Sequence, residues 1–310
     1  MKLLSFSMRL NEVSKKRFPK VRSKLLAVFA GLGANIWLGG SSLYWNAQGQ
    51  MAPVVLLAYR IFLSLALLLL VLMVVGGLKG LCGKLNKRSI TLHASAALLL
   101  VVNWGVFIWA SVQGYVLETG LGYLIAPCVT VMISVWGLNE RLSRQHVMVY
   151  LLVGGGVAFL VMCSKELQHG VYLAIAASWG GYVCLKKFSS LDVLSGSALE
   201  AGVLASGCLL VVAMALWRLE LPSAVFGFPK VSIVFSGFVS VFPLVLLAYA
   251  VKHLSLTVMS VFQFVLPITQ FILASVVFQQ SLSMAVVIVV LAVWGLMIFP
   301  LVLSAAKKLF

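Results

Sequence analysis

Acidic residues, and charged residues in general, are scarce in this sequence. Only 7 of its 310 residues are Asp or Glu, and charged residues of either sign make up 10%, against about 25% in a soluble domain. Hydrophobic residues account for 62%, and the mean hydropathy is +1.11. This little polar material cannot cover the surface of a soluble globular fold. The composition therefore excludes that class and indicates an integral membrane protein.

Patterns that mark common enzyme and metal sites are also missing. The 5 cysteines include no Cys-x-x-Cys pair. Neither the HExxH motif of zinc hydrolases nor the GxxxxGK[ST] loop that binds nucleotide phosphates occurs. We therefore expect no disulfide framework, no metal site, no cofactor and no enzyme activity. Primary transport driven by ATP would require a separate subunit.

The apolar residues instead form runs of the length that a bilayer requires. A transmembrane helix takes about 20 mostly apolar residues. Ten such stretches are separated by charged or turn-rich breaks, some so short that neighbouring helices must run antiparallel. The predicted fold class is an all-α integral membrane protein. The ten expected spans lie at approximately 25–45, 53–76, 91–112, 116–137, 147–163, 171–187, 198–217, 231–251, 256–278 and 283–303.

The remaining charge is basic, and it lies mainly on one side of this topology. The formal net charge is +16. With a cytoplasmic N-terminus, 19 of the 23 basic residues flank the cytoplasmic face and 3 lie on the opposite side. This is the positive-inside distribution of membrane proteins, so the charge indicates orientation and not a nucleic-acid partner. We expect a bacterial inner-membrane protein with both termini in the cytoplasm, a basic tail at 1–24 and a short C-terminal tail at 304–310.

The sequence resembles itself weakly when it is shifted by 140 residues. The shift matches Pro127 with Pro267, Gly155 with Gly295, and Leu142-Ser143 with Leu282-Ser283, while a shift of 141 matches Gly39-Gly40 with Gly180-Gly181. Each predicted repeat, 25–163 and 170–303, contains five spans. This odd number inverts the second copy in the membrane. Such inverted repeats are typical of secondary transporters, whose substrate site lies near the midplane between the repeats.

Motifs in both halves resemble those of one transporter family. In the first half they are Leu43-Tyr44-Trp45, Asn103-Trp104-Gly105, Leu121-Gly122-Tyr123 and Asn139-Glu140-Arg141-Leu142. In the second half the matching positions are Glu200, Gln263, Pro267, Gln270 and Phe271. The combination covers roughly 25–303 and resembles RarD-type transporters of the EamA branch of the drug/metabolite transporter superfamily. The resemblance implies ten helices in two inverted repeats, with a central cavity lined by spans one to four and six to nine.

Arg60 is the most informative residue inside a predicted span. A charged side chain at the bilayer centre costs about 2.5–3.5 kcal/mol on insertion scales, so it requires a partner or a wet cavity. Either Arg60 binds a substrate carboxylate or another anion through its planar guanidinium, or it forms a structural ion pair with Glu118 or Glu200. Glu118 has three further interpretations, namely a cation site, a proton carrier or a stabiliser of a helix N-terminus. Glu200 is the position that the 140-residue shift matches with Arg60.

Other polar and aromatic residues complete the candidate site. The aromatic residues have interfacial anchoring or helix packing as their structural alternative, and the amides have interhelical hydrogen bonding. Pro127 and Pro267 fall mid-span at matched positions, where each frees a backbone carbonyl, so they are candidate hinges. The other candidates for substrate binding or gating are Tyr44, Asn103, Trp104, Trp109, Tyr123, Trp179, Gln263 and Gln270.

These observations favour a secondary-active transporter over a membrane enzyme or a channel. The predicted substrate is a small amphiphilic metabolite, such as an amino acid or a drug-like compound, moved across the bacterial inner membrane by alternating access. The alternative is uptake or exchange of S-adenosylmethionine or a similar charged metabolite. The expected partners are the lipid bilayer and the small-molecule substrate, with a coupled proton or counter-substrate left open. No nucleic acid is expected.

Overall fold

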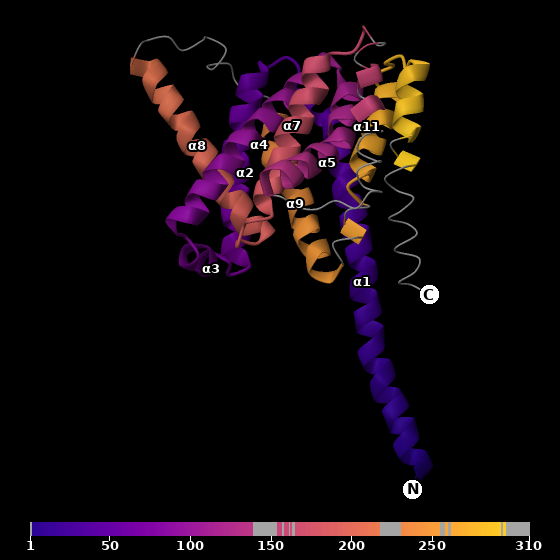
Figure 1. Cartoon of the computed structure of the whole chain (residues 1–310). Coiled ribbons are helices and arrows are strands. Elements are labelled where there is room, and N and C mark those ends of the chain that lie inside the picture. Colours follow the sequence, from indigo (N-terminus) through magenta and orange to yellow (C-terminus); the bar gives the residue numbers. More distant parts are fainter. Residues whose placement is uncertain are drawn as a thin grey trace.

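In a computed structural model the chain forms a bundle of helices (Figure 1). The structure describes residues 2–138, 154–156, 158–160, 162, 165–217, 231–254, 258–259, 262–292 and 294–295, and these contain no β-strand. The helices are α1 (Lys2–Ala47), α2 (Pro53–Val74), α3 (Leu78–Gly83), α4 (Lys87–Gln113), α5 (Val116–Leu138), α7 (His169–Lys186), α8 (Val193–Trp217), α9 (Ser236–His253) and α11 (Val265–Val276). A 3-10 helix, η2 (Val231–Phe235), leads into α9.

Several helices are long and apolar enough to cross a bilayer, which confirms the predicted class of helical membrane protein. Helix α2 shows why the prediction succeeds. Pro53 stands at its start, where a backbone N–H would have no carbonyl partner within the helix, and two glycines follow its end. The ten-helix count stays a prediction, because the expected spans 147–163 and 283–303 lie partly outside the described residues. Among the described residues, the segments long and apolar enough to cross a membrane are Ser23–Ala47, Pro53–Val74, Lys87–Gln113, Val193–Met214 and Val231–His253.

The expected span at 256–278 differs from the structure. Helix α11 begins only at Val265, after a turn at Gln263 and Phe264. Pro267 therefore lies in the first turn of α11, where its missing N–H leaves no carbonyl of the helix unpaired. The mid-span position predicted for Pro267 is wrong, whereas Pro127 does lie inside α5. A hinge role for either proline stays a prediction.

Helices α5 and α7 cross in close contact at a glycine. A Cβ atom on Gly180 of α7 would lie 2.8 Å from the backbone oxygen of Ala126 and 2.8 Å from the Cβ of Val129, both in α5. The Thr130 hydroxyl of α5 donates a hydrogen bond to the Gly180 carbonyl at 3.0 Å. Small residues allow helix backbones to approach closely in membranes, and here the approach holds α7 against α5.

The crossing of α1 and α11 repeats this geometry at an offset of 140 or 141 residues. A Cβ atom on Gly39 of α1 would lie 2.8 Å from the backbone oxygen of Leu266 and 2.8 Å from the Cβ of Thr269. The Gln270 side-chain amide donates to the Gly39 carbonyl at 3.5 Å. These four residues stand at that offset from the four residues of the α5–α7 crossing. Two helix pairs far apart in the sequence therefore share one packing arrangement.

The two adjacent glycines of α1 provide a test of this crossing. We expect Gly39→Ala to lower the stability by about 1–3 kcal/mol, because the added methyl overpacks against backbone. Gly40→Ala should be neutral or stabilising by up to about 1 kcal/mol, since no atom lies within 4 Å of its Cβ position and alanine favours the helix. The measurement is the thermal unfolding midpoint of each purified variant in detergent. Equal midpoints would contradict the close approach.

The basic segments of the chain gather at one end of the bundle, the lower end in Figure 1. Helix α3, the turn between α7 and α8, and the C-terminal end of α9 lie there, and the N-terminal part of α1 projects from it (Figure 1). The α2 helix starts at the opposite end, whereas α8 starts at this basic end. The basic residues near this end include Lys79, Lys84, Lys87, Arg88, Lys186, Lys187 and Lys252.

Helix α8 begins at this end with a side-chain cap. The Asp192 carboxylate accepts hydrogen bonds from the Ser195 hydroxyl at 2.7 Å and from the N–H groups of Leu194 and Ser195 at 3.1 Å each. Burial raises the pKa of Asp192, but these hydrogen bonds outweigh it and hold that pKa below its usual value. Such a cap satisfies N–H groups that the first turn leaves unpaired. It thereby fixes the start of the helix that carries Glu200.

Candidate functional site

Arg60 lies on the buried face of α2, one turn after Leu56 and one turn before Ser64. This four-residue spacing puts the three side chains on one side of the helix. Arg60 is 7% exposed. Its guanidinium carbon lies 4.1 Å from the centre of the Trp104 ring and 5.3 Å from that of Trp45. Two tryptophans, from α4 and α1, thus hold the cation by cation–π contacts.

The Arg60 guanidinium retains unused hydrogen-bond donors. Its Nε and Nη1 atoms are buried and have no hydrogen-bond partner among the described residues. Burying a charged group without full pairing costs free energy. Neither of the predicted ion pairs, with Glu118 or with Glu200, satisfies these donors in the described part of the chain. The arrangement leaves Arg60 able to bind an anion from outside the chain.

A hydrogen-bonded chain of side chains lies beside the guanidinium. The Tyr123 hydroxyl of α5 lies near Arg60 and donates a hydrogen bond to Asn103 Oδ1 at 3.0 Å. Asn103 Nδ2 donates in turn to the Ser178 hydroxyl at 3.3 Å, which connects α4 to α7. The Trp179 ring meets the Tyr123 ring edge-on, with centroids 5.7 Å apart. Four predicted site residues, Arg60, Asn103, Trp104 and Tyr123, therefore lie together, with Trp179 next to them.

Glu118 has a different environment from the one its predicted pairing with Arg60 implies. It is 2% exposed and lies in the first turn of α5. Its carboxylate accepts hydrogen bonds from the Gln280 side-chain amide at 3.1 Å and from the Gln168 N–H at 3.3 Å. The Gln280 carbonyl oxygen also accepts from the Leu117 N–H at 2.8 Å. Glu118 thus joins the start of α5 to two other segments, which agrees with the helix N-terminus interpretation.

Gln270 also connects helices. It is fully buried, accepts a hydrogen bond from the Thr119 hydroxyl, and donates to the Ser42 hydroxyl at 3.1 Å. Together with its contact to Gly39, this ties α11 to α5 and to α1. Interhelical hydrogen bonding, the alternative stated for the span amides, is what the structure shows for this residue.

Three other predicted residues lie away from Arg60. Trp109 is 40% exposed and packs against Tyr115 near the end of α4, with ring centroids 5.5 Å apart. Gln263 is exposed in the turn that precedes α11. The Tyr44 hydroxyl donates to the Ser232 carbonyl at 3.0 Å, while its ring packs edge-on against Trp45. Tyr44 therefore supports the Trp45 wall of the Arg60 site, and the other two do not contact that site.

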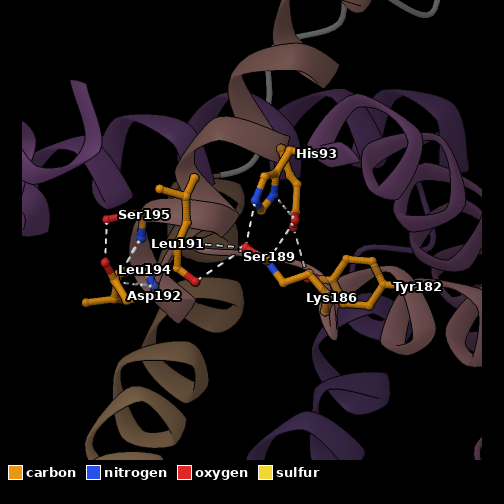
Figure 2. Close-up of polar contacts among 9 residues, drawn as sticks. His93, Tyr182, Lys186, Ser189, Leu191, Asp192, Leu194 and Ser195 are labelled. Atoms are coloured by element: carbon orange, nitrogen blue, oxygen red, sulfur yellow. Dashed lines mark hydrogen bonds and ion pairs between the residues drawn. The ribbon is translucent and has the colours of Figure 1, made fainter. Parts of the chain in front are cut away.

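Glu200 belongs to a second buried polar cluster, at the α7–α8 turn (Figure 2). Its Oε1 lies 2.7 Å from His93 Nδ1 and 2.8 Å from Lys186 Nζ. Its Oε2 accepts a hydrogen bond from the Tyr182 hydroxyl at 2.9 Å. His93 Nε2 lies 2.9 Å from the Ser189 hydroxyl. The cluster joins α4, α7 and α8 at the basic end of the bundle.

The predicted site residues did not include four members of this cluster, His93, Tyr182, Lys186 and Ser189. The sequence placed His93 near a cytoplasmic span end, as an interfacial or a proton-coupling residue, and Lys186 among the basic residues of the cytoplasmic face. The internal repeat carried a signal, because the offsets that match Arg60 with Glu200 also match Trp45 with Lys186. The structure shows that Arg60 contacts Trp45 in the first half and that Glu200 contacts Lys186 in the second, so the two contacts stand at matched positions.

The long apolar helices indicate a multi-pass membrane protein, and its relatives are transporters. Protein RarD of Streptomyces exfoliatus is 29% identical over 263 residues, which cover 81% of this chain and 80% of that protein. The uncharacterized transporter YojE of Bacillus subtilis (strain 168) is 26% identical and covers 86% of this chain and 90% of its own. An uncharacterized transporter of Vibrio cholerae is 24% identical, with coverage of 87% and 90%. The chain is a relative of the RarD-type transporters, as its motifs predicted.

Two further comparisons bear on the family and the fold. No family model matches the chain. A solved crystal structure superposes with a TM-score of 0.57 at 18% sequence identity, and the match covers 87% of this chain and 94% of that one. At this identity the likeness shows the fold alone. The relatives and the apolar helices together support a multi-pass bacterial membrane transporter.

Proposed function

We propose that this chain is a secondary-active transporter that binds a small amphiphilic metabolite carrying a carboxylate. The observation that supports this most strongly is Arg60, a buried guanidinium with free N–H donors between two tryptophan rings. A guanidinium matches a carboxylate in charge and in planar geometry. Trp45 and Trp104 offer apolar surface to the rest of the molecule. An aromatic amino acid, or a drug-like compound with both a carboxylate and an aromatic group, meets both requirements.

Alternating access between two inverted repeats is the mechanism that we propose. It draws support from the matched crossings of α1 with α11 and of α7 with α5, which share one geometry at a constant offset. Two inverted halves make the inward-open and outward-open states near mirror images, and hence close in energy. A substrate bound between them then needs little additional free energy to change sides.

Counterflow in liposomes tests the proposed function. Full-length protein is reconstituted, the vesicles are preloaded with unlabelled compound, and uptake of the labelled compound is followed in separate samples. The probes are phenylalanine as an amphiphilic amino acid, S-adenosylmethionine, and chloramphenicol. Chloramphenicol is included because a Pseudomonas aeruginosa relative, 29% identical over 104 residues, is called chloramphenicol-sensitive protein RarD. We expect phenylalanine to exchange. Chloramphenicol has no carboxylate, so its exchange without that of phenylalanine would contradict the carboxylate requirement. Exchange of S-adenosylmethionine alone would favour the alternative substrate, and no exchange of any probe would refute the proposal.

We also propose that both termini lie in the cytoplasm, because the described basic segments share one end of the bundle (Figure 1). Cys82 of α3 is exposed at that end and reports the orientation. A membrane-impermeant maleimide should leave Cys82 unlabelled in intact cells and label it after permeabilisation. A Cys82→Ser variant provides the background. Labelling of Cys82 in intact cells would reverse the proposed orientation.

A further inference from the structure

The Glu200 cluster is a second buried charged site, separate from the residues that face Arg60. We propose that Glu200 and His93 form a proton-binding site that couples the proposed transport to a proton gradient. The inference deepens the proposed function and rests on it. Three features support this inference. The cluster is buried, and its hydrogen bonds remain satisfied with and without the added proton. Aromatic residues of α7 connect the cluster to the Arg60 site.

The cluster holds a carboxylate that is shielded from both lipid and water. Glu200 is 0% exposed and His93 is 1% exposed, whereas the Lys186 side chain is 22% exposed. Gly196, one turn before Glu200 on α8, makes room for this arrangement. A Cβ atom there would lie 2.6 Å from Lys186 Nζ and 2.9 Å from His93 Cε1. The close approach brings an acid, an imidazole and an amine to one point (Figure 2).

The groups that face Glu200 come from each helix packed against it. Helix α4 contributes His93, and α7 contributes Tyr182 and Lys186. Helices α2 and α9 pack against Ala198 and Ala201 of α8 through apolar side chains, including Leu65, Leu68 and Val241. With a neutral imidazole, Glu200 and Lys186 balance each other. One added proton therefore changes the cluster from neutral to singly positive, and no other described charge in contact compensates for it.

The Ser189 hydroxyl can serve both protonation states. In the unprotonated state His93 donates from Nδ1 to Glu200, and Nε2 accepts from Ser189. A proton added at Nε2 lets Nδ1 pass its own proton to Glu200 Oε1, which returns the imidazole to neutral and leaves a carboxylic acid. Nε2 then donates to Ser189 Oγ, whose proton turns to the Leu191 carbonyl at 3.4 Å. No polar group is left unpaired in either state, which buried networks require.

Solvent can reach this relay from the basic end of the bundle. Ser189 is partly exposed in the turn that joins α7 to α8, whereas the imidazole and carboxylate behind it are buried. A proton from water at the turn thus meets Ser189 and His93 before Glu200. An imidazole is suited to this role because either ring nitrogen can hold the proton.

A continuous contact path leads from Glu200 toward the Arg60 site. Tyr182 donates to Glu200 Oε2 and stacks on Trp179, with ring centroids 5.3 Å apart and an interplanar angle of 25°. Trp179 contacts Tyr123, which lies beside Arg60. When Oε1 gains a proton, the carboxylate becomes a weaker acceptor for the Tyr182 hydroxyl. The hydrogen bond that holds α7 to α8 weakens, and the aromatic contacts transmit the change to Tyr123.

The test separates exchange from proton coupling in the same proteoliposomes. Counterflow of labelled phenylalanine, or of chloramphenicol where that is the compound that exchanges, is measured at equal pH on both sides. Accumulation of the same compound is then measured under an imposed gradient of one pH unit, in each polarity. For wild type we expect one polarity to give up to about tenfold accumulation at one-to-one coupling. For Glu200→Gln we expect counterflow within about twofold of wild type and no gradient-driven accumulation.

Variants along the relay sharpen the test. His93→Gln should behave like Glu200→Gln, because glutamine preserves hydrogen bonding but cannot relay a proton. The matched control is Glu166→Gln, which removes an exposed carboxylate and should change neither measurement. The inference fails if folded Glu200→Gln still accumulates compound under the gradient, or if it loses counterflow as well. It also fails if wild type exchanges but ignores the gradient, which leaves the proposed function intact.

A measurement without substrate distinguishes failure of the proton site from failure of the proposed function. Infrared difference spectra of purified wild-type protein, recorded between acidic and alkaline buffer, should contain the C=O band of a protonated buried carboxyl. Glu200→Gln should remove that band, and Asp192→Asn, which alters the nearby cap, should retain it. Persistence of the band in Glu200→Gln overturns the assignment even where no probe exchanges.

Discussion

Arg60→Gln is expected to lower phenylalanine exchange by about 100-fold or more at subsaturating concentration. The substrate carboxylate loses charge-assisted hydrogen bonds of about 1.5–3 kcal/mol each, and each 1.4 kcal/mol changes affinity about tenfold. Arg60→Lys should recover little, because a lysine lacks the planar fork and stacks less well between Trp45 and Trp104. The measurement is the initial rate of counterflow across a range of substrate concentrations.

Stability distinguishes a binding residue from a structural one at this position. A buried guanidinium with two unpartnered nitrogens costs free energy, so its removal should leave the unfolding midpoint unchanged or raise it. A structural ion pair would give the opposite result, since breaking one leaves an uncompensated buried charge. Arg88→Gln, an exposed basic residue on the predicted cytoplasmic face, is the matched control. Unchanged exchange by Arg60→Gln, or a large fall in its midpoint, would contradict the assignment.

The sequence predicted helix positions well wherever local chemistry decides them. Expected spans at 53–76 and 116–137 became α2 at Pro53–Val74 and α5 at Val116–Leu138. Proline at a helix start and glycine at a helix end fix the helix boundary through residues that are close in sequence. A short stretch of sequence is therefore enough to predict that boundary. Pro267 shows the limit, because it lies in the first turn of α11, where hydropathy alone predicted an uninterrupted span.

The partners of the charged residues were harder to predict, because they depend on how distant helices pack. The two protein ion pairs considered from the sequence joined Arg60 to Glu118 or to Glu200. In the structure Glu200 instead contacts His93, which is 107 residues away in the sequence, and Glu118 contacts Gln280, which is 162 residues away. Burial and charge identified which residues required a partner. Only the helix crossings decided which partner each one has.

Helices α1 and α4 meet at the end of the bundle opposite the basic segments (Figure 1). The Asn46 side chain donates to the Ser111 carbonyl at 3.0 Å and lies 3.4 Å from the Val112 carbonyl. The 140-residue offset relates this pair of helix ends to those of α7 and α9. Among the described residues α7 and α9 make no comparable contact. The two halves therefore differ here, with α1 and α4 closed against each other.

This difference predicts that a covalent link between α1 and α4 stops transport. If alternation exchanges the arrangements of the two halves, α1 must leave α4 in the other state. A Cβ atom on Gly49 would lie 3.6 Å from Val112 Cγ1, so cysteines at both positions fall within disulfide reach after a small shift. We expect oxidised Gly49→Cys/Val112→Cys protein to reduce counterflow to the level of empty liposomes, and reduction with a thiol to restore it.

The two single variants, Gly49→Cys and Val112→Cys, serve as controls and should exchange at wild-type rates under oxidising conditions. Reversal by the thiol is the informative result, because it distinguishes inhibition by the disulfide from damage caused by the substitutions. Full exchange by the oxidised double variant would mean that the α1–α4 contact persists through the transport cycle. In that case the asymmetry between α1–α4 and α7–α9 is a fixed feature of the two repeats, and the moving elements must lie among the other helix pairs.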